Sequence, residues 1–113
     1  MSLKLYGIPN CDTVKKARDF LSKHHLEYTF IDFKKTPPTI ALIKAAKDFV
    51  GDLPVNKSGV TYKKYKDEYE KLSEAKKIDF MITQSSMIKR PILTKNDQII
   101  CLGFSAETYA KLF

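Results

Sequence analysis

Cys11 is the residue whose position in the sequence points most directly to chemistry. It follows a short apolar stretch at 3–6 and a turn that contains Gly7 and Pro9, and a helical pattern begins directly after it. The N-terminus of a helix leaves backbone N–H groups unpaired and carries partial positive charge, so it favours an anion. Because the thiolate is the reactive form of cysteine, this position predicts a nucleophile.

The neighbours of Cys11 bear on this prediction in opposite ways. Asp12 disfavours a thiolate unless its carboxylate turns away to cap the helix, a role for which Thr13 is also suited. Lys15, one helical turn further, would favour the thiolate and an anionic substrate, although its position also suits an ordinary surface lysine. The alternative for Cys11 itself is a small buried hydrophobe under the helix.

A second, resolving thiol is expected to come from outside the chain. Val14 occupies the position three residues after Cys11, so the sequence has no C-x-x-C motif. The other cysteine, Cys101, is flanked by apolar residues and is expected in the core. A monothiol mechanism that uses an external thiol such as glutathione therefore fits better than a dithiol mechanism. Two such distant cysteines form no disulfide framework, which favours a reducing compartment.

The dipeptide Arg90-Pro91 is the second candidate for chemistry. A proline before a short strand can hold a cis peptide bond in a tight turn. A fixed turn would aim the Arg90 guanidinium at a carboxylate or an oxyanion, whereas the alternative is a surface pair with Lys89. Lys57 lies in a polar loop and would add a second positive charge.

The elements that must position these residues alternate in type. The stretches 3–6 and 28–33 read as strands on either side of a helix that begins directly after Cys11 and runs to about His24, so the two strands should be parallel. Further helices are predicted from Pro37 to Gly51, over 61–72, from Ser73 onward and from Ser105, and a strand hairpin is predicted over 90–102. The order βα-βα, helices, ββα predicts one α/β domain over 1–113, thioredoxin-like, with a helical insertion at about 36–86.

The composition excludes several other classes of protein. The net charge of +7 comes from lysine pairs spread along the chain and no binding motif accompanies it, so we expect no nucleic-acid partner. No apolar run reaches the length of a membrane span, so we expect no association with a membrane. The first residues lack the regions of a signal peptide, so we expect a cytoplasmic location. His24 and His25 have no zinc-ligand spacing with either cysteine, so no metal is expected.

The sequence resembles the arsenate reductase (ArsC)-like family, which includes Spx-type regulators and YffB-type proteins. The matching segments are LYGIPNCDT at 5–13, KKAR at 15–18, the loop 56–62, IKRPI at 88–92 and LGFS at 102–105, and they are most similar to the YffB type. The resemblance implies a thioredoxin-like fold with an inserted helical portion and a nucleophilic Cys11. It also implies that Arg90 binds an oxyanion or the carboxylate of a thiol substrate beside a cis Pro91. Asn10, directly before Cys11, is a further candidate for binding the substrate or the thiol.

Three features of the arsenate reductases are missing from this sequence. Gly7 replaces their histidine four residues before the cysteine, Lys57 and its neighbours replace their central arginine, and a third arginine is absent near Cys101. We therefore expect a thiol oxidoreductase with no bound cofactor that uses glutathione as co-substrate, or glutaredoxin as partner. Its substrate would be a small oxidised thiol or an oxyanion. The alternatives are an Spx-like regulator that binds a protein partner without turnover, and an arsenate reductase.

Overall fold

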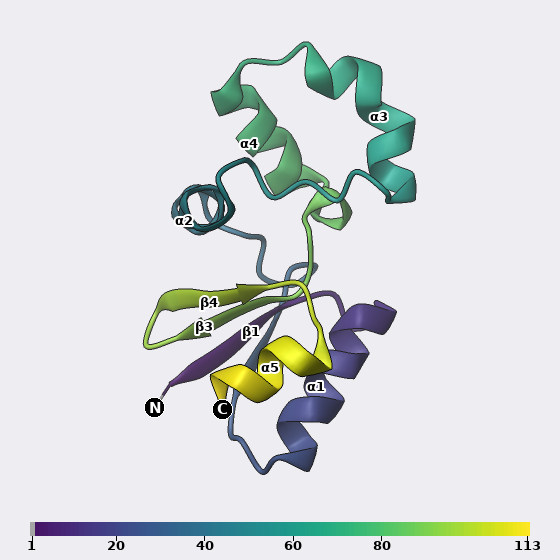
Figure 1. Ribbon diagram of the computed structural model, residues 1–113. Helices are drawn as coiled ribbons and strands as arrows, with labels where there is room; N and C mark the ends of the chain where they lie inside the picture. Colours follow the sequence, from purple (N-terminus) through teal and green to yellow (C-terminus); the bar gives the residue numbers. More distant parts are fainter. Residues whose placement is uncertain (1) are drawn as a thin grey trace. The chain divides into compact units, whose positions relative to one another are not determined.

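The computed structural model describes residues 2–113, and the chain divides into two units (Figure 1). One unit combines the described residues up to Thr36 with Arg90–Phe113, and the other is Pro37–Lys89. The first unit contains β1 (Leu3–Gly7), α1 (Asp12–Lys23), β2 (Thr29–Asp32), β3 (Ile92–Lys95), β4 (Gln98–Leu102) and α5 (Ala106–Leu112). The second contains α2 (Ile40–Val50), α3 (Val60–Glu70), α4 (Glu74–Thr83) and the 3₁₀ turn η1 (Ser85–Met87).

The first unit is built on a four-stranded sheet with the strand order β2-β1-β3-β4. β1 and β2 are parallel, with Leu5 opposite Phe30, as predicted for two strands joined by the helix α1. β3 is antiparallel to β1 and to β4, so Leu93 lies between Leu5 and Cys101. This is the thioredoxin-like arrangement, and it confirms the predicted fold class.

The helices α1 and α5 lie on the same side of this sheet (Figure 1), and their apolar faces form its core. Ala17 and Leu21 come from α1 and Tyr109 from α5. All three are fully buried in one cluster with residues of the sheet, among them Leu5 of β1 and Leu93 of β3. The spacing of the buried α1 residues is that of one helix face, so the same pattern that predicts the helix also fixes which side it buries. Cys101 is buried in this core, as predicted.

Short polar residues set the ends of several elements. Ser105 begins α5 by accepting a hydrogen bond from the Thr108 backbone N–H at 3.1 Å. The β3–β4 hairpin turns at Asn96 and Asp97, which have φ angles of 52° and 66°. Two consecutive positive φ angles define the two-residue turn that matches the twist of a hairpin, and Asn and Asp tolerate them well. Gly51, at φ 90°, ends α2 in the left-handed conformation, as predicted.

The second unit is helical and has its own buried residues. Tyr62 and Tyr69 on α3 are buried, and the ring of Tyr69 packs edge-to-face on Phe80 of α4, with 6.0 Å between ring centroids. Ser73 begins α4, where the sequence predicts a new helix. No helix among residues 2–113 is long and apolar enough to cross a membrane.

Candidate functional site

Cys11 lies between the end of β1 and the start of α1. Its backbone is extended, with φ −93° and ψ 127°, and it is itself the N-cap of the helix. Its N–H donates to the Ile8 carbonyl at 3.2 Å, and its carbonyl accepts the N–H of Lys15 at 3.0 Å. The prediction that Asp12 or Thr13 caps α1 is therefore wrong, because the turn after β1 places Cys11 in the capping position.

Arg90 reaches Cys11 because of how β1 and β3 pair. The two strands are antiparallel, with Tyr6 opposite Ile92. The residues that follow β1 and those that precede β3 therefore lie beyond the same end of these two strands. The peptide bond between Arg90 and Pro91 is cis, as predicted, and Pro91 is buried. The Arg90 side chain then lies close enough to the Cys11 thiol to form a hydrogen bond with it.

The surroundings of Cys11 favour its thiolate. Partial burial by itself raises the pKa of the thiol, but other influences outweigh it and leave the pKa below its usual value. In decreasing order these are the backbone amide of Val14, the hydrogen bond and positive charge of Arg90, and the backbone amide of Thr13. Cys11 is partly exposed, so an external molecule can reach a thiol that is ionised more readily than usual.

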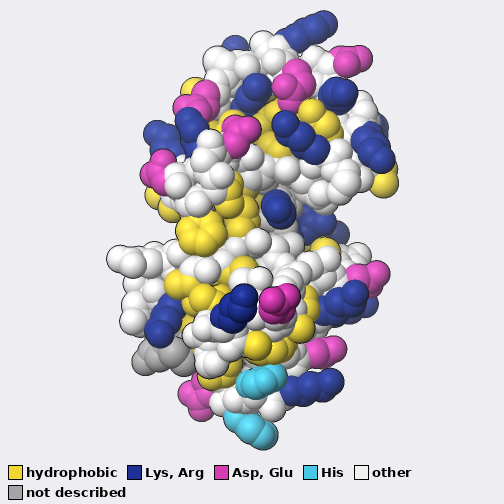
Figure 2. All heavy atoms as spheres, in the orientation of Figure 1, with side chains coloured by type: hydrophobic (Ala, Val, Ile, Leu, Met, Phe, Trp, Pro, Cys, Tyr) yellow, Lys and Arg dark blue, Asp and Glu magenta, His cyan; other side chains and the backbone are white. Residues whose placement is uncertain are grey.

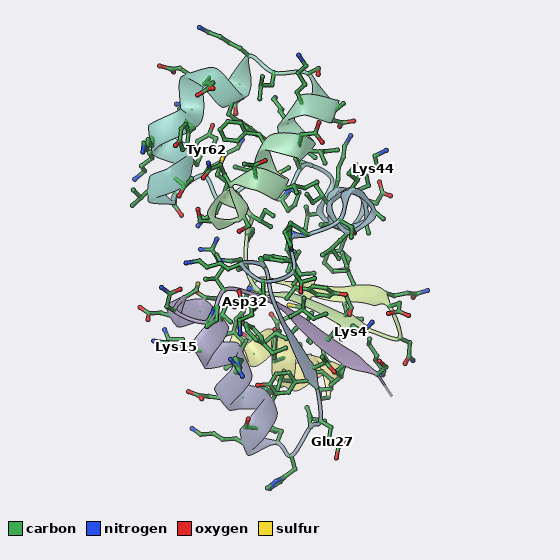
Figure 3. The ribbon with its side chains drawn as sticks, turned by 180° about the vertical axis from the view of Figure 1, so that it is seen from behind. Lys4, Lys15, Glu27, Asp32, Lys44 and Tyr62 are labelled. Carbon is green, nitrogen blue, oxygen red and sulfur yellow. The ribbon has the colours of Figure 1, made fainter. Side chains whose placement is uncertain are left out.

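The remaining predicted binding residues lie in different places. Asn10 is exposed in the turn directly before Cys11, and Lys15 is exposed on α1 (Figure 3). Lys57 belongs to the helical unit, where it lines a small cavity of about 70 Å³ together with residues that include Asp52 and Glu70. The structure therefore brings Cys11 together with Arg90, Pro91 and Asn10, whereas the role of Lys57 stays a prediction.

Sequence reasoning missed the part played by Val14. The sequence shows only that Val14 replaces the second cysteine of a C-x-x-C motif, whereas its backbone N–H favours the Cys11 thiolate. Its side chain is fully buried and lies against Gly7. A Cβ atom on residue 7 would stand 2.8 Å from Cγ2 of Val14, which is closer than real Cβ contacts. A histidine in place of Gly7 would therefore need a different residue or position for Val14.

We expect Gly7→Ala to lower the free energy of unfolding by about 1–3 kcal/mol, because it overpacks a buried contact. Val14 cannot easily turn away, since a β-branched side chain on a helix has one strongly preferred rotamer. Denaturant titration measures the effect. Gly7→Ala should lower the free energy of unfolding clearly less in a Val14→Ala background than in the wild type. An equal loss in both backgrounds would contradict the proposed clash.

The described residues offer little for a metal ion, and positive charge is dispersed on the face that Figure 2 shows. Across residues 2–113, no group of three or more His, Cys, Asp and Glu side chains is arranged to hold a metal ion. Figure 2 shows Lys and Arg side chains scattered over the visible face with Asp and Glu among them. The positive side chains visible on that face are therefore spread rather than gathered into one patch.

Comparisons with known proteins cover nearly the whole chain. The family model described as "ArsC family" matches residues 6–112. The solved structure of a YFFB protein is 34% identical, with 96% of each chain covered and a TM-score of 0.83. The uncharacterised protein YusI of Bacillus subtilis is 30% identical over 96% of each chain. The regulatory protein MgsR of the same organism is 22% identical over 97% of this chain and 89% of its own.

Proposed function

Because the chain belongs to the ArsC family, we propose that it is a thiol-dependent oxidoreductase whose nucleophile is Cys11. The observation that carries the proposal is the position of a partly exposed Cys11 at the N-cap of α1 and beside Arg90, where its surroundings hold the pKa of the thiol below its usual value. Glutathione is the proposed co-substrate, with glutaredoxin as an alternative source of electrons, and the proposed location is the cytoplasm. The proposed substrate is a small oxidised thiol or an oxyanion.

The proposed reaction on a disulfide has two exchange steps. The Cys11 thiolate attacks one sulfur of the substrate, a bond forms between the two sulfurs, and the other half of the substrate leaves as a thiolate that takes a proton from water. The thiolate of glutathione then attacks the substrate sulfur of this mixed disulfide and releases Cys11 as a thiolate. Glutathione supplies the electrons, and Cys11 returns unchanged. Arg90 stabilises the Cys11 thiolate before the first step and after the second.

Treatment of the native protein with oxidised glutathione tests this proposal. We expect mass spectrometry to find one glutathione on Cys11 and none on Cys101, because Cys101 is only 7% exposed and donates a hydrogen bond to the Gly103 carbonyl. In denaturant both cysteines should react at similar rates. Cys11→Ser should abolish labelling of the native protein. A Cys11–Cys101 disulfide, or a native Cys11 that reacts no faster than in denaturant, would contradict the monothiol mechanism.

A second candidate function is that of a regulatory binding protein without turnover. The observation that favours it is the similarity to MgsR, which is described as a regulatory protein. A regulator would bind a protein partner through surfaces other than the Cys11 site, so its binding should survive Cys11→Ser. Catalytic reduction of a model disulfide over many turnovers, driven by glutathione and lost in Cys11→Ser, would decide in favour of the oxidoreductase.

A further inference from the structure

We propose that the oxidised thiol on which Cys11 acts carries a glutathionyl group, and that a depression on α1 binds the γ-glutamyl end of this group while its sulfur bonds to Cys11. This inference rests on the proposed function and names the substrate group that the site recognises. Its starting point is the spacing of Cys11, Lys15, Arg18 and Ser22, which stand at i, i+4, i+7 and i+11. Lys15, Arg18 and Ser22 follow one face of α1, and Cys11 is the N-cap at the end of the helix where this face begins, so a molecule attached to Cys11 can extend along the other three.

Arg18 is held in a fixed position on this face. Its Nε donates a hydrogen bond to the Tyr28 hydroxyl at 3.1 Å, and its guanidinium lies over the Phe30 ring, 4.2 Å from the centroid. Phe30 belongs to β2, and Tyr28 comes directly before this strand. A guanidinium carries five N–H donors and the bond to Tyr28 uses one, so Arg18 presents a preorganised donor group to a ligand.

The depression has the chemistry of a site for an amino acid head group. It measures about 400 Å³ and is lined by Pro9, Lys15, Arg18, Asp19, Ser22 and Tyr28. Lys15 and Arg18 can hold a carboxylate, while the Asp19 carboxylate can hold an ammonium group. Glutathione carries both groups on one carbon of its γ-glutamyl residue. A purely anionic ligand would leave Asp19 opposed to it, which is why we choose the zwitterionic head group.

The distances allow one glutathione to reach both places. The two Cα atoms of a disulfide lie about 5.5–6 Å apart, and two residues of extended chain add about 7 Å. Arg18 lies seven residues beyond Cys11, or about 10 Å along the helix. The γ-glutamyl group of glutathione bound to Cys11 can therefore enter the depression, while the glycine carboxylate stays free to face Arg90. Lys15 would act here as a binding residue rather than as a source of thiolate stabilisation.

The test compares two disulfides, oxidised glutathione and the disulfide of cysteinylglycine, which lacks the γ-glutamyl group. The measured quantity is the rate at which Cys11 forms a mixed disulfide, followed by mass spectrometry. We expect Asp19→Asn and Lys15→Gln each to slow the reaction with oxidised glutathione by up to about fivefold, the range of a surface charge pair. Both variants should react with the cysteinylglycine disulfide at the wild-type rate.

Asp19→Asn separates a binding site from general electrostatic attraction. Oxidised glutathione is an anion, so removal of a negative charge would speed its approach if only the overall field mattered. The matched control is Lys16→Gln, which removes one positive charge from an exposed neighbour on another face of α1 and should change neither rate. A faster reaction of Asp19→Asn, or equal slowing by Lys16→Gln and Lys15→Gln, would overturn the γ-glutamyl site and leave the proposed function standing. A wild-type Cys11 that reacts with neither disulfide faster than an unfolded cysteine would overturn both.

Discussion

Arg90→Gln should slow the alkylation of Cys11 at pH 7 by about three- to tenfold, since it removes a charge-assisted hydrogen bond at a partly exposed site. Two of the influences that lower the pKa of Cys11 come from this one side chain, its hydrogen bond and its positive charge. Without them, the burial that raises the pKa is opposed only by the amides of Val14 and Thr13. Less of the thiol is then ionised at neutral pH.

The rate of reaction with iodoacetamide, measured from pH 5 to 10, distinguishes this effect from other causes. Iodoacetamide is uncharged, so its approach does not depend on the charge of Arg90. The rate should rise with pH and level off once the thiol is fully ionised, and the whole curve of Arg90→Gln should lie at higher pH than that of the wild type. At the highest pH the two proteins should react at nearly equal rates.

Lys89→Gln is the matched control, because it removes the same charge from the adjacent residue. Lys89 is exposed, and its backbone N–H is bonded to the Pro54 carbonyl, so its loss should leave both the fold and the curve unchanged. An equal displacement of the curve in both variants would show that net charge alone governs Cys11. A wild-type curve for Arg90→Gln would show that the helix amides suffice without the guanidinium.

Local patterns were enough to predict most of the fold. The spacing of Val14, Ala17 and Leu21 predicts α1 because a helix that covers a sheet must bury one face, and these residues are fully buried. Gly51 marks the end of α2 because a left-handed residue there is easiest for glycine. The register of the sheet was not predictable, since it depends on pairings between strands far apart in the sequence.

The candidate site was predictable in part only. The position of Cys11 could be inferred from the turn and helix around it, but Asp12 and Thr13 are intrinsically better N-caps than cysteine. The hydrogen bond from the Cys11 N–H to the Ile8 carbonyl places Cys11, rather than Asp12 or Thr13, at the N-cap of α1. This bond depends on the path of the turn that follows β1. The pairing of Arg18 with Tyr28 was missed for the same reason, because it needs the path of the chain between α1 and β2.

Tyr109→Phe should raise the free energy of unfolding by about 1–3 kcal/mol, because it removes a buried hydroxyl that has no hydrogen-bond partner among residues 2–113. Tyr109 is fully buried, and its ring packs edge-to-face on Phe20 and Phe104 with centroids 5.5 and 4.7 Å away. Phenylalanine keeps the ring and these contacts, so the substitution changes only the polar atom. Denaturant titration at pH 7 measures the gain.

The same substitution should change how the protein responds to alkaline pH. Burial, with a smaller contribution from Cys101, raises the pKa of Tyr109, so the folded state favours the protonated hydroxyl. This preference for the protonated hydroxyl contributes fully to the free energy of unfolding below pH 10. The contribution is lost as the pH rises further, because the tyrosine of the unfolded chain releases its proton first. The decline in stability above pH 10 should therefore be shallower in Tyr109→Phe. Burial also raises the pKa of Tyr69, to about 12, so part of the decline should remain.

Tyr62→Phe is the control for the Tyr109 hydroxyl, because the Tyr62 hydroxyl donates a hydrogen bond to Glu70 at 3.0 Å. A tyrosine whose hydroxyl is bonded should lose stability when it becomes phenylalanine, whereas Tyr109 should gain. If Tyr109→Phe destabilised the protein as Tyr62→Phe does, its hydroxyl would have to be satisfied in the folded state. The sign of the change, rather than its size, therefore decides whether the aromatic core beneath the sheet holds an unpaired polar group.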